Sequence, residues 1–193
     1  ATARYTYDGK YTVTGNIRRD GTSTIVNDEN KEITTWSAGF VWNAIKEEFM
    51  RNQNTLTDFR VRLSYGAVPN IGSIPSRSAQ VAGYATSSYV GSTITGIVPN
   101  SPGNPNLRIE FVNMSNLGID LAAWDNRASL SVDAYYNKTV DLFVTQPLSA
   151  TSGFASLPIN AGVMSNKGLE FVGSVDVVRT NDFGVRLGAN HAI

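Results

Sequence analysis

Residues 127–137, RASLSVDAYYN, decide the fold because apolar and polar side chains alternate along the whole stretch. One face of the stretch carries Ala128, Leu130, Val132, Ala134 and Tyr136, and the intervening, mostly polar side chains fall on the other. A period of two is typical of a β-strand with one apolar and one polar face. The stretch therefore predicts a strand that separates two environments. A soluble β-sandwich shows the same alternation, since each of its sheets has one solvated face.

Similar alternation predicts eight strands, at residues 2–7, 11–19, 34–42, 59–66, 108–124, 127–137, 163–178 and 183–193. Two tight connections fix their pairing. The two-residue turn Asp125-Asn126 suits a β-hairpin and places Ala123 opposite Ala128. The turn at residues 8–10 likewise places Tyr7 opposite Tyr11. The one helical stretch that we expect is residues 45–51.

Strand length and loop order favour a membrane barrel over a sandwich. The predicted strands run to about ten residues, which suits a tilted strand that crosses a bilayer and exceeds the usual globular strand. Long connections at residues 20–33, 67–106 and 138–160 alternate with shorter ones. Outer-membrane barrels have short periplasmic turns and long exterior loops. The sequence therefore predicts an all-β fold, an antiparallel transmembrane β-barrel segment.

Aromatic side chains gather near both ends of the predicted strands. Those at the short-turn end are Tyr7, Tyr11, Trp42, Phe59 and Phe183, and those at the long-loop end are Trp36 and Tyr65. This placement fits the two aromatic girdles of membrane barrels. The core of a sandwich also accepts aromatic residues at strand ends, so the girdles leave both interpretations open.

Composition excludes several classes of function. The 193 residues carry no net charge and include no cysteine and one histidine, His191. Without cysteine there is no disulfide framework or thiolate site, so we expect no metal, no cofactor and no catalytic residues. Balanced charge argues against nucleic acid, which usually needs a basic surface. No apolar run approaches the roughly 18 residues of a membrane helix.

Several motifs, in order, resemble the barrel of SusC/RagA-family TonB-dependent transporters. They are NIRRDG (16–21), SAGF (37–40), RVRLSYG (60–66), NPNLRIE (104–110), LGID (117–120), and the run from residue 126 to 153 followed by NAGVMSNKGLE (160–170). The resemblance implies a plugged barrel of about 22 strands, of which this chain would supply about eight. Residues 1–193 would then be one partial barrel domain, without the plug, the TonB box or a signal peptide.

The resemblance also implies a function. Members of this family lie in the Gram-negative outer membrane and import oligosaccharides or peptides with a SusD-like surface lipoprotein, engaging the TonB complex through the plug region. Outer-membrane lipid would cover the apolar face. Two alternatives remain: a secreted carbohydrate-binding β-sandwich, and a small closed eight-stranded barrel. The small barrel would need its own signal peptide and an aromatic C-terminal residue.

Charged side chains on the polar face are the candidate site. They are Arg18, Arg60, Arg62, Asp120, Asp133, Glu170, Asp176 and Arg186. As a set they are expected to line the lumen, where they would hold the plug or contact substrate. For each one singly, the preferred alternative is a solvated wall with cross-strand pairs that contribute little. Tyr84 and Tyr89 are candidate contacts to substrate or lipoprotein in the longest loop, for which a passive solvated loop is the alternative.

Overall fold

The computed structural model of the chain describes residues 1–23, 25, 29, 31–70, 81–89 and 92–193. Its strands are β1 (Thr2–Tyr7), β2 (Tyr11–Gly21), β3 (Glu32–Asn43), β4 (Leu56–Pro69), β5 (Val81–Tyr89), β6 (Ser92–Ser101), β7 (Phe111–Ala123), β8 (Ala128–Pro147), β9 (Ser156–Arg179) and β10 (Gly184–Ala192). Three 3₁₀ turns join them: η1 (Ala44–Lys46), η2 (Glu48–Met50) and η3 (Ala150–Ser152). No helix in this part of the chain is long and apolar enough to cross a membrane.

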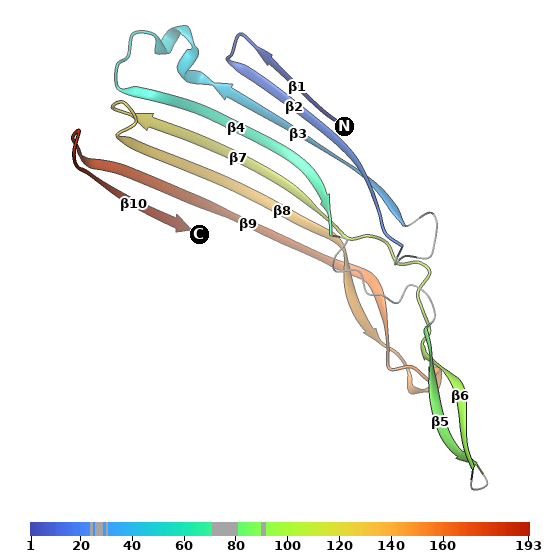
Figure 1. Cartoon of the computed structure of the whole chain (residues 1–193). Coiled ribbons are helices and arrows are strands. Elements are labelled where there is room, and N and C mark those ends of the chain that lie inside the picture. Colours follow the sequence, from blue (N-terminus) through green and yellow to red (C-terminus); the bar gives the residue numbers. More distant parts are fainter. Residues whose placement is uncertain (24, 26–28, 30, 71–80, 90–91) are drawn as a thin grey trace.

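Eight of the strands form one antiparallel sheet in the order β1-β2-β3-β4-β7-β8-β9-β10. Figure 1 shows this main sheet as a single layer, with β5 and β6 as a separate hairpin beyond one of its ends. β1 and β10 are the two edges of the sheet, which therefore stays open. A sandwich needs a second sheet packed on the first, and the described strands supply none.

The turns set the register as predicted. Ala123 lies opposite Ala128 and Tyr7 opposite Tyr11, so both predicted pairings are confirmed. Asp125 and Asn126 have φ values of 54° and 62°. A two-residue hairpin turn of type I′ requires positive φ at both central positions, which aspartate and asparagine tolerate better than most residues. This turn chemistry fixes which side chains of β7 and β8 share a face.

The connections divide between the two ends of the sheet. Figure 1 shows the links β1–β2, β3–β4, β7–β8 and β9–β10 at one end, and the links β2–β3, β4–β7 and β8–β9 at the other. We call these the turn end and the loop end. The connections predicted to be long thus share one end of the sheet as expected, but their lengths do not alternate as predicted: the β3–β4 link, residues 44–55, is longer than the β2–β3 link, residues 22–31, and the β8–β9 link, residues 148–155.

The loop end holds more strand than predicted. β8 has 20 residues and β9 has 24, so the expected loop at residues 138–160 shrinks to the short link between Pro147 and Ser156. A tilted strand crosses a bilayer with about 9–11 residues. The paired continuation, residues 138–165, therefore extends past a bilayer's thickness, and we call it the β8–β9 arm.

Three further expectations need correction. The expected loop at residues 67–106 contains the β5–β6 hairpin, although residues 71–80 and 90–91 lie outside the described part. The strand expected from residue 108 begins at Phe111. The helical stretch expected at residues 45–51 is two 3₁₀ turns, η1 and η2, and not a continuous helix.

Little of the main sheet is packed against protein. The buried hydrophobic residues among those described are Ile25, Ala44, Leu107, Ile109 and Ala122. By contrast, Leu63, Leu117 and Leu169 on the apolar face are exposed. Aromatic rings cluster at two levels of that face: Trp36 lies 5.5 Å from Tyr65 and Trp42 lies 6.4 Å from Phe59, between ring centres.

Candidate functional site

All eight charged residues predicted for the polar face lie on one face of the main sheet. Residues directly opposite each other in an antiparallel pair point to the same side. From β2 to β10, the register partners that place the charged residues on this one face are Arg18–Thr35, Val41–Arg62, Arg60–Asp120, Gly118–Asp133, Asp133–Glu170 and Asp176–Arg186. That this face lines a lumen stays a prediction.

Arg62 forms the centre of this face. From β4 its Nε donates to Asp120 Oδ2 at 2.7 Å, and its Nη2 reaches both carboxylate oxygens of Asp133 at 3.1 Å. Ser131 donates to Asp120 Oδ1 at 2.8 Å. One guanidinium thus ties β4 to β7 and β8 and balances one of the two carboxylates. Because these groups are half-exposed, each ion pair contributes at most about 1 kcal/mol.

Gly118 makes the room for this arrangement. It lies between Arg62 and Asp133 in register. A Cβ at Gly118 would lie 2.6 Å from Asp133 Oδ1 and 2.7 Å from Arg62 Nη2. The guanidinium therefore rests over a bare backbone, which a side chain at this position would occupy.

The other candidate charges pair more locally. Arg18 pairs with Asp20 at 2.9 Å and Arg60 with Asp58 at 2.7 Å, in each case two residues away on the same strand. Glu170 lies directly opposite Asp133, and two like charges so placed disfavour the pair. The bond from Arg62 to Asp133 offsets part of that repulsion.

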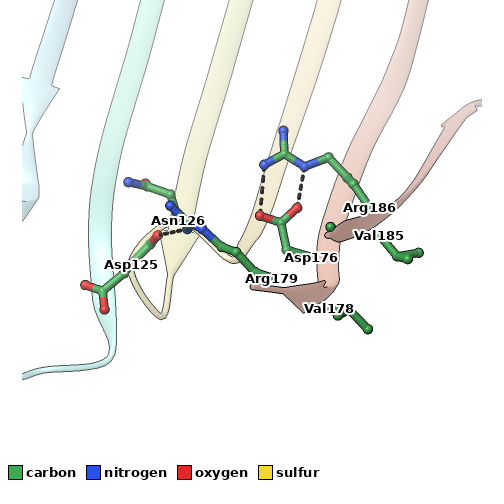
Figure 2. Close-up of a pocket in the computed structure, with 8 residues that line it drawn as sticks. Asp125, Asn126, Asp176, Val178, Arg179, Val185 and Arg186 are labelled. Carbon is green, nitrogen blue, oxygen red and sulfur yellow. Dashed lines mark hydrogen bonds and ion pairs between the residues drawn. The ribbon is translucent and has the colours of Figure 1, made fainter. Parts of the chain in front are cut away.

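A hollow at the turn end joins two more of the candidates. Figure 2 shows the Arg186 guanidinium facing the Asp176 carboxylate, with contacts of 2.5 and 3.0 Å. Arg179 Nη1 donates to the backbone oxygen of Asp125 at 3.0 Å, which links the β7–β8 turn to β9. The open hollow of about 480 Å³ between them is lined mainly by polar groups that already bond each other. Because these groups satisfy one another, the hollow is part of the barrel wall and not a ligand site.

A second polar arrangement, at the loop end, was missed in the sequence. Residues 104–110, which we call the strap, run between the end of β4 and the β8–β9 arm. Leu107 and Ile109 are buried there, and Asn104 Nδ2 donates to the backbone oxygen of Pro158 at 2.8 Å. Glu110 is also buried and accepts bonds from Asn70 and from the Phe143 backbone. Alternating Leu107 and Ile109 within NPNLRIE were the available signal.

Asn160 fastens the strap to the arm. Its Oδ1 accepts from Arg108 N at 2.8 Å, and its Nδ2 donates to Arg108 O at 2.9 Å and to Asp141 O at 2.6 Å. One side-chain amide thereby takes the place of a neighbouring strand for Arg108. Arg108 also pairs with the Asp141 carboxylate at 2.7 Å. The arm and strap form one bonded unit.

The two loop candidates, Tyr84 and Tyr89, belong to β5. Their side chains fall outside what the structure describes, so their contacts stay a prediction.

Taken together, a one-layer antiparallel sheet, an uncovered apolar face with two aromatic levels, and a charged opposite face define a class of protein: the wall of a transmembrane β-barrel. Comparison with known proteins names the family within that class. Residues 1–192 match the family described as TonB dependent receptor-like, beta-barrel, and the chain belongs to that family.

The relatives that the chain matches include proteins named as TonB-dependent receptors. TonB-dependent receptor P3 of Formosa agariphila is 35% identical over 93% of this chain. TonB-dependent receptor SusC of Bacteroides thetaiotaomicron is 28% identical over 96% of it. The solved structure of the RagAB peptide importer in its closed-closed state superposes with a TM-score of 0.88 and 25% identity, over 99% of this chain. The predicted SusC/RagA-family membership is confirmed, and the protein is integral to the outer membrane.

The chain spans about a fifth of the length of these proteins: 18% of the Formosa receptor, 19% of SusC and 21% of the importer chain.

Proposed function

We propose that this chain is part of the barrel wall of a TonB-dependent importer that takes up oligosaccharides or peptides together with a SusD-like surface lipoprotein. The observation that carries the proposal is the two-sided wall within a chain whose relatives include SusC and a peptide importer. Membership of the family supports transport. The choice between the two substrate classes is left to experiment.

The two faces take different roles in this proposal. The apolar face, with exposed Leu63, Leu117 and Leu169, faces lipid. The opposite face, centred on Arg62 and its two carboxylates, faces the lumen, where water and the plug surround it. Lipid-facing and lumen-facing residues alternate along the strands of such barrels.

The mechanism is binding and gating without covalent chemistry. Arg62 is already held by Asp120 and Asp133, so this part of the wall is a fixed surface against which a plug can move. Energy would enter through TonB acting on the plug. The charged lumenal set would keep that surface hydrated and orient the plug or a passing solute.

The loop end supplies the contact with the lipoprotein or substrate. The β8–β9 arm reaches beyond the bilayer and is braced by the strap, and the β5–β6 hairpin lies past the end of the sheet (Figure 1). Isolated two-stranded hairpins are only marginally stable in water. A partner that packs on the β5–β6 hairpin would stabilise it.

The test is to replace residues 81–101 of the full-length receptor by a short Gly-Ser linker. We expect normal surface levels of the receptor, reduced co-purification of its lipoprotein, and reduced uptake of labelled oligosaccharide or peptide mixtures. Replacement of residues 180–183, the β9–β10 link at the turn end, by the same linker is the matched control, and it should leave lipoprotein capture and uptake unchanged. If the hairpin variant captures lipoprotein and imports both mixtures as the parent does, the contact lies elsewhere.

A further inference from the structure

The connection between β3 and β4 folds back over the apolar side of the turn end. Trp42 pairs in register with Tyr11 and with Val61, so its indole belongs to the apolar face. Within the connection, Phe49 of η2 has its ring centre 6.4 Å from that of Trp42, at an interplanar angle of 56°. Trp42 lies equally close to Phe59 on the other side, at 6.4 Å. The connection thus extends the aromatic cluster of Trp42 and Phe59 at the turn end.

Glu47 fastens the connection in this position. Its Oε1 accepts a hydrogen bond from the Tyr11 hydroxyl and another from Trp42 Nε1 at 3.1 Å, while Lys10 Nζ lies 3.4 Å from its Oε2. The Glu47 side chain is only 15% exposed. The polar groups of both aromatic residues are therefore satisfied within the protein, and Lys10 balances the carboxylate.

Phe49 is left on the outside of this fastened segment, with 66% of its surface exposed. Neighbouring residues in a 3₁₀ turn point about 120° apart, so Phe49 and the exposed Glu48 face different surroundings. The family membership establishes a membrane barrel, and under the proposed face assignment the exposed Phe49 ring beside Trp42 continues the lipid-facing surface at the turn end. Aromatic rings at headgroup level anchor barrels in the bilayer.

We propose that the connection containing η1 and η2 is an interfacial anchor, which lies at headgroup level of the periplasmic leaflet and inserts Phe49 among the lipid acyl chains. The short-turn end of such barrels faces the periplasm. The inference rests on the assignment of the apolar face to lipid in the proposed function. The partner is the bilayer itself.

The test uses the full-length receptor, freed of any native cysteine, with single cysteines labelled by the fluorophore NBD in phosphatidylcholine vesicles. The label is placed at Phe49→Cys and, as the matched control in the same connection, at the exposed polar position Asn54→Cys. Phosphatidylcholines that carry a nitroxide on the headgroup or on the acyl chain quench the label by depth. Leu63→Cys and Ser64→Cys report the two faces of β4 independently.

We expect the label at position 49 to be quenched at least twofold more than that at position 54, most strongly by a nitroxide high on the acyl chain. Equal weak quenching at positions 49 and 54, with strong quenching at position 63, would overturn the anchor while leaving the face assignment intact. Weak quenching at position 63 and strong quenching at position 64 would overturn the face assignment itself. Label emission that is blue-shifted but unquenched at position 49 would show a protein contact and also overturn the anchor.

Discussion

Apolar side chains on the main sheet and in the strap have opposite surroundings. On the sheet, Leu63 and Leu117 are 53% and 45% exposed, whereas in the strap Leu107 and Ile109 are 0% and 3% exposed. Burying such a side chain is worth about 1.5–3 kcal/mol in water. The sheet forgoes this gain along a whole face, and the strap does not. In the proposed function, lipid completes the packing of the first region, whereas protein already completes that of the second.

The largest expected effect is the difference in cost between truncating a leucine in the strap and truncating one on the apolar face of the sheet. Leu107→Ala should lower the free energy of unfolding of the arm and strap by about 2–5 kcal/mol, because removal of a fully buried side chain leaves a cavity. Leu63→Ala should cost clearly less, since mobile acyl chains fill the space. Hydrogen exchange of the strap and denaturant titration of the full-length receptor in lipid measure both. Equal costs would remove the distinction between the regions.

Charge placement tests the sheet alone. Leu63 lies between the two aromatic levels of the apolar face, so Leu63→Arg should cost roughly 2–4 kcal/mol, as for a cation near the bilayer midplane. Ser64→Arg, one residue on, should cost less than about 1 kcal/mol because it points to the polar face. Refolding titrations into vesicles compare the two variants. A larger penalty at Ser64 would invert the face assignment.

A smaller effect probes the centre of the polar face. Gly118→Ala should destabilise by roughly 1 kcal/mol, because the new Cβ displaces the flexible ends of Arg62 and Asp133. Gly39→Ala is the control on the same face, since its Cβ would approach nothing closer than 3.9 Å. Gly39→Ala should be neutral or slightly stabilising, because alanine reduces the conformational entropy of the unfolded chain. The same refolding titrations measure both variants. Equal tolerance of alanine at the two glycines would show that Arg62 does not need the bare backbone of Gly118.

The smallest effect concerns pH at the turn end. The hydrogen bonds from Tyr11, then Trp42 and Lys10, hold the pKa of Glu47 below its ordinary value of 4.5. The unfolded chain then binds more protons below that pH, so the stabilisation is present at neutral pH and fades as the pH falls through 4.5 and lower. Protection of the connection's amides should weaken on acidification from about pH 7 to pH 3.5.

Tyr11→Phe supplies the control for this pH dependence. It removes the largest cause of the shift, so the pKa of Glu47 should return toward its ordinary value and the loss of protection on acidification should shrink. An unchanged acid response in this variant would show that Glu47 does not hold the connection.

The membrane-spanning half of the fold followed from sequence because its rules are local. Two-residue periodicity and the Asp125-Asn126 turn set the faces and the β7–β8 register, and the eight charged candidates fall on one face as expected. The partners of these charged residues could not be predicted, because Arg62 bonds to Asp120 and Asp133, which are 58 and 71 positions away in the sequence.

The loop end was poorly predicted for a physical reason. The strand predicted at residues 127–137 continues beyond that range, because Leu142 and Val144 suit a strand and pair with β9, while Val140 pairs with Phe111 of β7. The Ser-, Gly- and Thr-rich composition of residues 67–106 was read as a loop, although Thr93, Ile94, Thr95, Ile97 and Val98 within it favour a strand. Strap packing depends on contacts such as that of Asn160 with Arg108, which sequence spacing does not reveal.

The most direct test of the two-sided wall is a single-cysteine scan of residues 59–65 in the full-length receptor, spin-labelled and embedded in lipid bilayers. Relaxation by oxygen, which concentrates in lipid, is compared at each position with relaxation by a water-soluble nickel chelate. We expect high oxygen accessibility at Phe59, Val61, Leu63 and Tyr65, and low accessibility at Arg60, Arg62 and Ser64. A flat profile, or one with the even positions in lipid, would contradict the assignment of the apolar face to the membrane.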